Sequence, residues 1–211
     1  MRRLSRLRPL PGVTGLRAVK DAILRKARES ADVKEQFFRA EADRIEALAR
    51  VLAAAFQRGG RLYVMGNGGG ATDAQHVAVE FCHPIVEKRR ALPALALTTD
   101  SALLTAISND RDFSKVFGDQ LRTLARAGDM ALALSTSGQS PNLVHGLEVA
   151  RELGLLTIAF TGKDGGRLAA LADHGLVVPS FSIHRIQETH VALYHVVWDL
   201  VHVALGEDDV L

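Results

Sequence analysis

The chain has 211 residues, of which 47% are hydrophobic, 24% charged and 5% aromatic, a composition typical of a globular α/β protein with one core. No stretch approaches the roughly 18 uninterrupted apolar residues that a membrane span needs, so a membrane protein is not expected. Cys82 is the only cysteine, which excludes an intrachain disulfide and favours a cytoplasmic location, and we expect it to be a small core residue rather than a nucleophile.

The net charge of +2 is unevenly distributed along the chain. Residues 1–28 hold nine of the 26 basic residues and one of the 24 acidic residues. Such a segment could contact nucleic acid or a membrane surface, and an organelle transit peptide has a similar composition. We expect instead a solvated basic extension over residues 1–29 and one domain over residues 30–211, without a nucleic-acid partner.

The first predicted element is a long amphipathic helix. Prolines and glycines interrupt the chain before it, so we expect the helix to begin near Leu16 and to end at Gly59-Gly60. Apolar residues recur along it at helical spacing: Val33, Phe37, Ile45, Leu48, Leu52 and Phe56. One face of this helix is therefore expected to be buried.

After Gly60 the pattern alternates between short apolar runs and helical segments. Strands are predicted at 61–66, 93–98, 129–134, 155–160 and 175–178, and helices near 72–83, 100–107, 112–127, 141–153, 167–172 and 184–205. Asp73 or Thr72 is expected to cap the first of these helices, and Pro141 to occupy the first turn of another. The alternation predicts an α/β fold with a doubly wound, flavodoxin-like parallel sheet of five strands, flanked by helices. The long N- and C-terminal helices are left free for contacts in an oligomer.

Two turns rich in glycine and hydroxyl groups follow predicted strands. They are Gly66-Asn67-Gly68-Gly69-Gly70 and Ser135-Thr136-Ser137-Gly138-Gln139-Ser140. Turns at the carboxyl ends of parallel strands are where ligands bind in such sheets. Because glycine lets the backbone approach a ligand and the amides at a helix start face an anion, we predict a phosphorylated small molecule as the ligand.

Two helical segments carry residues that could do chemistry. His76 and Glu80 are four residues apart, so they share a helix face and could bind zinc or act only as a surface pair. Gln187 and His195 lie eight residues apart on the last helix, about 80° around its axis. By spacing alone, histidines that are buried in the core and satisfied by hydrogen bonds are the favoured explanation for this second set.

Two further turns complete the candidate residues. Asn109-Asp110 could hold sugar hydroxyls, or Asp110 could cap the helix through Phe113. The turn 161–166 lacks the Gly-Lys-Ser/Thr ending of a nucleotide-binding P-loop, although Lys163 could contact an anion. No Gly-x-Gly-x-x-Gly motif with a downstream acid occurs, so NAD is not an expected cofactor.

Six motifs, taken together and in order, resemble the sugar isomerase (SIS) domain family and, within it, the phosphoheptose isomerases. They are Gly66-Asn67-Gly68-Gly69, Asp73-Ala74-x-His76 with Glu80, Asn109-Asp110, Ser135-Thr136-Ser137-Gly138-x-Ser140, Thr161–Gly166 and Arg185-Ile186-Gln187-Glu188. The resemblance covers residues from about 30 to 205.

The resemblance implies an aldose–ketose isomerase that converts sedoheptulose 7-phosphate to D-glycero-D-manno-heptose 7-phosphate through an enediol. It implies a homotetramer with active sites at subunit interfaces. By position, the implied zinc ligands are His76, Glu80, Gln187 and His195, and Glu80 and His195 are the implied acid/base pair. The implied substrate contacts are Asn67, Gly68, Gly69, Glu80, Asn109, Asp110, Ser135, Thr136, Ser137, Ser140 and Gln187.

Three positions depart from the pattern of the family. Gly70 stands where serine is usual, His83-Pro84 replaces Gly-Arg, and Ile183-His184 replaces Ala-Asp. These changes leave the reaction class in place but open two alternatives. One is the same reaction on another sugar phosphate, and the other is a non-catalytic SIS protein that binds a sugar phosphate or a replication-initiator partner.

Overall fold

The computed structural model describes residues 13–85 and 89–209. The first twelve residues of the predicted basic extension lie outside the described ranges. The helices are α1 (Val13–Gln57), α2 (Gly69–Cys82), α3 (Ser101–Asp110), the 3-10 turn η1 (Phe113–Lys115), α4 (Val116–Leu124), α5 (Pro141–Glu152), α6 (Gly166–Leu171) and α7 (Ile183–Ala204). The strands are β1 (Leu62–Gly66), β2 (Ala94–Ala96), β3 (Met130–Ser135), β4 (Leu156–Gly162) and β5 (His174–Val178).

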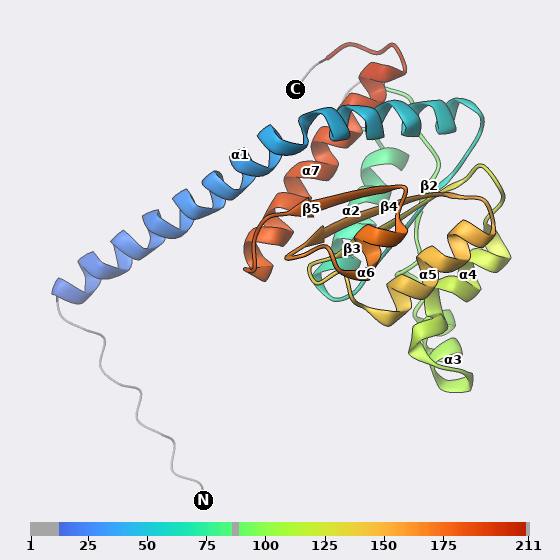
Figure 1. Ribbon diagram of the computed structural model, residues 1–211, viewed down its shortest axis with the longest axis horizontal. Helices are drawn as coiled ribbons and strands as arrows, with labels where there is room; N and C mark the ends of the chain where they lie inside the picture. The colour runs from blue at the N-terminus through green and yellow to red at the C-terminus, as the bar shows by residue number, and fades with distance from the viewer. Residues whose placement is uncertain (1–12, 86–88, 210–211) are drawn as a thin grey trace, which may run out of the picture.

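The five strands form one parallel sheet in the order β2-β1-β3-β4-β5, which confirms the predicted flavodoxin-like topology. Successive side chains of a strand point to opposite faces, and both faces are covered. Leu62 and Val64 of β1 therefore pack in the core beneath α1, α2 and α7. Tyr63 and Met65 of the same strand pack in the core beneath α4, α5 and α6. Figure 1 shows the sheet between these two layers of helices.

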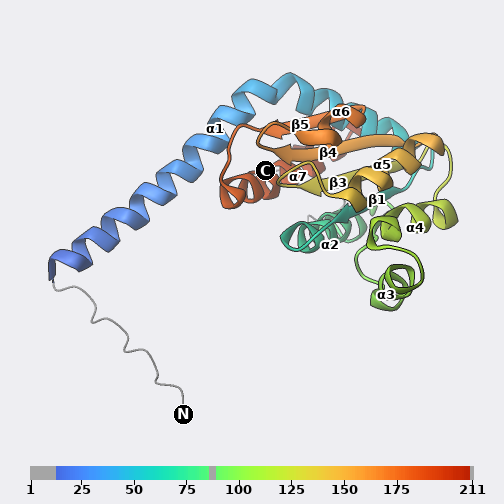
Figure 2. The same ribbon diagram turned by 60° about the horizontal axis from the view of Figure 1, so that its bottom comes forward.

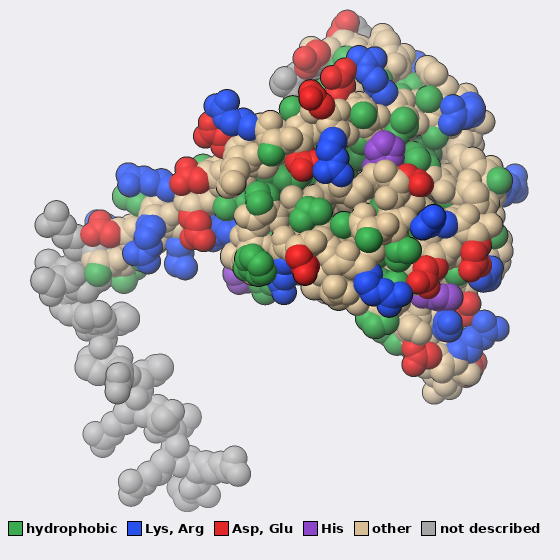
Figure 3. Space-filling model, viewed as in Figure 1, with side chains coloured by type: hydrophobic (Ala, Val, Ile, Leu, Met, Phe, Trp, Pro, Cys, Tyr) green, Lys and Arg blue, Asp and Glu red, His purple; other side chains and the backbone are tan. Residues whose placement is uncertain are grey.

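The longest helix, α1, crosses the predicted division at residue 29 without a break. Its C-terminal half is buried through the apolar stripe that includes Phe37 and Leu48, whereas its N-terminal part extends away from the molecule (Figures 1 and 2). Acidic and basic side chains are interspersed along this extending part (Figure 3). Val19, Ile23 and Leu24 there are each more than half exposed.

The helix boundaries are largely as predicted, with two corrections. The helix expected over 112–127 is interrupted, because Asp112 caps a 3-10 turn by accepting from the Ser114 amide at 2.7 Å, and α4 then ends at Leu124. The prediction that Asp73 or Thr72 caps α2 is wrong: the helix begins earlier, at Gly69, and both residues lie inside it. Pro141 does occupy the first turn of α5. None of the described helices has the length and apolar character that would cross a membrane.

Candidate active site

The two predicted ligand-binding turns lie side by side at the carboxyl edge of the sheet. Gly66 of β1 pairs with Leu134 of β3, so the chain leaves both strands at the same level. Helix α2 then packs on one face of the sheet and α5 on the other, which makes this edge the topological switch point.

A cavity of about 260 Å³ opens between these turns and the start of α7. It is lined by Asn67, Gly69, Gly70, Asp73, Leu134, Ser135, Thr136, Ser137, Ser140, Leu143, Ile183, His184, Gln187 and His190. We call it the hydroxyl pocket, because four of its lining side chains are the hydroxyl groups of the 135–140 turn. Among the residues that the structure describes, no lysine or arginine lines it, so an anion would be held there by hydroxyls, backbone amides and the start of α5.

The 135–140 turn is held in shape by its own hydroxyls and by a neighbouring turn. Ser135 Oγ accepts from the Gly138 amide at 3.1 Å, and Ser137 Oγ accepts from the Gln139 amide at 3.3 Å. Gly138 has a φ of +64°, and a Cβ there would lie 2.0 Å from the Gly165 carbonyl oxygen. The 161–166 turn therefore packs against the 135–140 turn and helps to hold its shape. This contact agrees with the prediction that the 161–166 turn has mainly a structural role.

A pair of asparagines joins the two turns. The Asn67 amide donates to Asn142 Oδ1 at 2.8 Å, and the Asn142 amide donates back to Asn67 Oδ1 at 2.8 Å. Asn142 is 2% exposed, so its polar groups depend on this partner. The sequence analysis missed Asn142, although its position directly after Pro141 at the start of α5 was an available signal.

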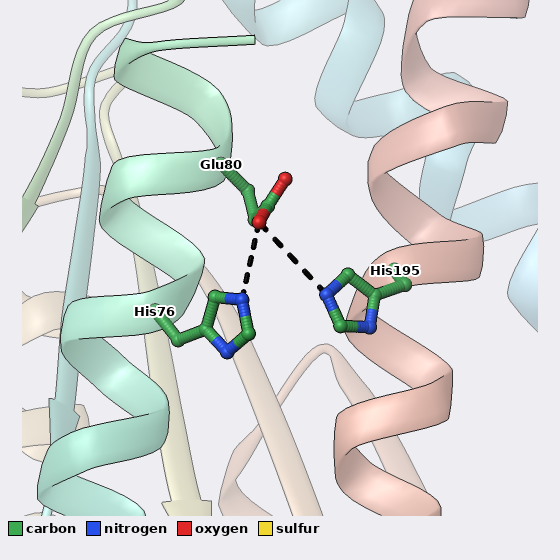
Figure 4. Close-up of side chains that lie close together, drawn as sticks. All are labelled: His76, Glu80 and His195. Carbon is green, nitrogen blue, oxygen red and sulfur yellow. Dashed lines mark hydrogen bonds and ion pairs between the residues drawn. The ribbon is translucent and has the colours of Figure 1, made fainter. Parts of the chain in front are cut away.

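The second part of the site is a cluster of His76, Glu80 and His195, which we call the His–Glu cluster. Figure 4 shows His76 and Glu80 projecting from α2 toward His195 on α7. The distance from His76 Nε2 to Glu80 Oε1 is 3.1 Å, and that from His195 Nε2 to the same oxygen is 3.9 Å. Their ligand atoms all lie within 4.8 Å of one another, so these two imidazoles and one carboxylate could hold a metal ion. The side chains are 19–43% exposed, which leaves them accessible to a ligand.

Tyr194 completes the surroundings of His76. Its hydroxyl lies 2.8 Å from His76 Nδ1, and its ring contacts both histidines of the cluster. Burial, together with the carboxylates of Asp73 and Glu80, raises the pKa of this tyrosine, so the hydroxyl stays protonated. The sequence analysis did not single out Tyr194, because a tyrosine at this position reads as part of the apolar face of the helix.

Gln187 lies on the wall of the hydroxyl pocket rather than hydrogen-bonded to the His–Glu cluster. Its side-chain amide donates to Asp73 Oδ2 at 3.0 Å, one turn before His76 on α2. Gly69 leaves room for it, because a Cβ there would lie 2.4 Å from Gln187 Nε2. Burial raises the pKa of Asp73, while the bond from Gln187 and the nearby His76 oppose this shift. Asp73 and Gln187 thus connect the two parts of the site.

Some candidates lie elsewhere in the chain. Asn109 and Asp110 end α3, where the Asn109 amide donates to Asp110 at 2.8 Å, and neither lines the hydroxyl pocket. Asp110 is not the cap expected for the helix through Phe113, because Asp112 has that role.

Gly68 precedes α2 with a φ of +54°. His190 lies at the bottom of the hydroxyl pocket but is 1% exposed, and its ring nitrogen Nε2 donates to the buried Thr161 carbonyl at 3.0 Å.

The three departures from the family pattern have different positions. Gly70 and His184 both line the hydroxyl pocket. Pro84 follows the end of α2 at Cys82, and a proline disfavours the helical conformation of the residue before it, in agreement with the φ of −139° and ψ of 71° at His83. Two of the three changes therefore alter the wall that a ligand would contact.

Comparisons with known proteins agree on one family. Residues 27–162 match the family described as SIS domain. A phosphoheptose isomerase of Thermodesulfovibrio yellowstonii is 44% identical over 90% of this chain and 94% of that protein, and one of Desulfovibrio desulfuricans is 46% identical over 89% and 90%. The solved structure of a phosphoheptose isomerase from Neisseria gonorrhoeae superposes with a TM-score of 0.80 at 36% identity, covering 87% of this chain and 98% of that one.

Proposed function

This chain belongs to the SIS domain family, and from that premise we propose that it is an aldose–ketose isomerase that converts sedoheptulose 7-phosphate to D-glycero-D-manno-heptose 7-phosphate. The relatives named phosphoheptose isomerase span most of the chain, which supports this reaction. The observation that carries the proposal is the juxtaposition of the hydroxyl pocket with the His–Glu cluster along α2, where Asp73 of the pocket wall lies one turn before His76 of the cluster.

The phosphate end of the substrate occupies the hydroxyl pocket. Its oxygens accept from the side chains of the 135–140 turn and from amides at the start of α5, which face an anion favourably. The asparagine pair keeps the two turns at a fixed separation, so the sugar is oriented before any bond changes. The substrate-binding residues in this proposal are Asn67, Gly68, Gly69, Glu80, Asn109, Asp110, Ser135, Thr136, Ser137, Ser140 and Gln187.

Glu80 and His195 move the protons. Isomerisation breaks the C1–H bond of the ketose, passes through an enediol and forms a C2–H bond, while a hydroxyl proton moves between O1 and O2. A carboxylate and an imidazole 3.9 Å apart can share these transfers near neutral pH. Both groups are partly exposed, so the carbonyl end of the sugar can reach them from the open side of the cluster.

His76, Glu80, Gln187 and His195 are the proposed ligands of a zinc ion. The His–Glu cluster fits such an ion because its donor atoms already converge, and imidazole with carboxylate is a common zinc ligand set. Zinc, when bound, supplies polarisation of the substrate carbonyl and stabilisation of the enediolate oxygens. The two oxygens of the Glu80 carboxylate allow this residue to be both a ligand and a proton carrier.

We further propose a cytoplasmic homotetramer with active sites at subunit interfaces. Exposed apolar side chains on the extending part of α1, together with a helix α3 that has no buried residue, support such contacts. In such a tetramer, Asn109 and Asp110 at the end of α3 would contact the substrate in the pocket of a neighbouring subunit. Light scattering coupled to gel filtration tests the assembly, and a monomer would overturn this part of the proposal.

A second candidate function is the same isomerisation on another sugar phosphate. The observation that favours it is the place of Gly70 and His184 on the wall of the hydroxyl pocket, where a serine and an aspartate are usual. A non-catalytic role is a third outcome, which the retention of both Glu80 and His195 disfavours.

One set of assays separates these functions. Purified protein is assayed for isomerisation of heptose, hexose and pentose phosphates, and its metal content is measured. We expect turnover of sedoheptulose 7-phosphate that is lost in a Glu80→Gln variant and kept in a Glu148→Gln variant. Turnover of a hexose or pentose phosphate alone would favour the second candidate function. No turnover of any sugar phosphate would overturn the proposal that this protein is an isomerase.

A further inference from the structure

We propose that Tyr194 is a positioning residue of the His–Glu cluster: its hydroxyl holds the His76 ring so that Nε2 faces Glu80 and His195. This inference deepens the proposed function and rests on it where zinc binding is concerned. The orientation of His76 in the metal-free protein does not depend on the reaction, so the two can be tested separately.

The contacts of Tyr194 are with the site rather than with the core alone. Tyr194 is 3% exposed, and its hydroxyl oxygen lies 2.8 Å from His76 Nδ1. Its ring packs edge-on against His76 at 5.2 Å between centroids and tilts against His195 at 4.7 Å. The tyrosine therefore contacts both histidines of the cluster at once.

The hydrogen bonds define the tautomer of His76. Glu80 Oε1 is 3.1 Å from His76 Nε2, and a carboxylate oxygen accepts, so Nε2 carries the hydrogen and donates it. In the neutral ring, Nδ1 then has a lone pair, which accepts from the Tyr194 hydroxyl. The result is a directed chain in which Tyr194 donates to His76 and His76 donates to Glu80.

A hydroxyl suits this position because it can either donate a hydrogen bond to Nδ1 or accept one from it. If Nε2 binds a cation, the ring hydrogen must move to Nδ1, and the same hydroxyl then accepts from Nδ1–H. Partners of this kind hold a ligating histidine in place, and their removal weakens metal binding by about tenfold to a hundredfold. A phenylalanine at 194 keeps the ring contacts but leaves Nδ1 without this partner in either state.

The chain provides a matched control. It contains two tyrosines, and Tyr63 is likewise 2% exposed, with a hydroxyl that donates to the Leu124 carbonyl at 2.8 Å. This bond lies on the α4 side of the sheet, away from the His–Glu cluster. A Tyr63→Phe variant therefore removes one buried tyrosine hydrogen bond without touching the site.

The test compares Tyr194→Phe and Tyr63→Phe with the wild-type protein by two measurements. The first is the dissociation constant for Zn²⁺ alone, from competition with a chelator. The second is the ¹⁵N spectrum of histidine-labelled, metal-free protein, in which a His76→Gln variant assigns the His76 signals. We expect Tyr194→Phe to weaken zinc binding about tenfold and to change the His76 ring-nitrogen shifts, while Tyr63→Phe changes neither.

An unchanged zinc dissociation constant in Tyr194→Phe would overturn the proposal, as would unchanged His76 shifts. Equal losses in the two variants would also overturn it, because they would show a general effect of packing. If the wild-type protein binds no zinc, the metal part of the proposed function fails, and the His76 shifts alone decide the role of Tyr194.

Discussion

The hydroxyl pocket and the His–Glu cluster adjoin each other but are built in opposite ways. The pocket is lined by two glycine- and hydroxyl-rich turns and by the start of α7, and among the residues that the structure describes no lysine or arginine lines it. The cluster comes from faces of α2 and α7, more than a hundred residues apart in the chain, and consists of titratable groups. One part is therefore fixed by local turn geometry, and the other depends on how two helices pack.

This difference suggests a division of labour within the site. Groups without a formal charge can bind a phosphate over a wide pH range, whereas proton transfer needs groups that titrate near neutrality. Changes in the pocket should mainly alter the KM, and changes in the cluster should mainly alter kcat. The following predictions, from the largest expected effect to the smallest, test that separation.

Glu80→Gln should lower kcat by about a thousandfold with a small change in KM, since a missing general acid or base typically costs a hundredfold to ten-thousandfold. Steady-state kinetics with sedoheptulose 7-phosphate measure both constants. Glu148→Gln, which alters an exposed pair with Arg167, is the control and should resemble the wild-type protein. A Glu80→Gln variant that changes KM alone would contradict the separation.

Asn142→Leu should lower the free energy of unfolding by about 2–3 kcal/mol. The leucine side chain cannot form hydrogen bonds, so the side-chain amide of Asn67 would lose both of its bonds to residue 142. Denaturant titration measures this loss. The double variant with Asn67→Leu should lose less than the sum of the two single variants, as expected for groups in direct contact. Strict additivity would show that the pair does not join the two turns.

The buried His190 of α7 should make the stability of the protein depend on pH. Complete burial lowers the pKa of His190 to about 4, whereas an unfolded histidine has a pKa near 6.5. The unfolded chain therefore binds more protons between these values, and this contribution to stability is complete above pH 6.5 and is lost as the pH falls toward 4.

Between pH 7.5 and 5.0, the wild-type protein should lose about 2 kcal/mol more of its unfolding free energy than a His190→Gln variant. The glutamine amide can still donate to the Thr161 carbonyl, so the two proteins should be similar at pH 7.5. Denaturant titrations at the two pH values measure the difference. Parallel losses in both proteins would show that His190 is not the group responsible.

Thr136→Val should raise the KM about tenfold and leave kcat nearly unchanged, because one hydrogen bond to the phosphate is worth about 1.4 kcal/mol. Thr123→Val, on an exposed turn of α4, is the matched control. A fall in kcat without a change in KM would place Thr136 in the chemistry rather than in binding.

The contrast between the two parts also explains what the sequence could predict. The turns of the hydroxyl pocket were visible because a strand, a glycine or serine run and a helix follow one another locally, and the sheet order followed from the alternation. The caps were less predictable, since Asp110 and Asp112 are both plausible before Phe113 and only the backbone decides between them. Cys82, expected in the core, is exposed instead and donates to the Ala94 carbonyl.

The His–Glu cluster shows the limit of local reasoning. Spacing placed His76 and Glu80 on one face, but it could not show that α7 brings His195 to within 3.9 Å of the same carboxylate. Asn142 and Tyr194 act through partners 75 and 118 residues away, so a local pattern could mark the position of Asn142 but not the partner of either residue. His190 and His195 look alike in sequence, and only the packing of α7 buries the first and leaves the second 39% exposed beside Glu80.

The central claim is that Glu80 and His195 exchange protons with a sugar held by the hydroxyl pocket. The most direct test is to incubate sedoheptulose 7-phosphate with the protein in D₂O and to follow the sugar by NMR. The account predicts an aldose 7-phosphate that carries deuterium at C2, formed by the wild-type protein and not by Glu80→Gln. Product that forms without deuterium, or at an equal rate in the variant, would contradict it.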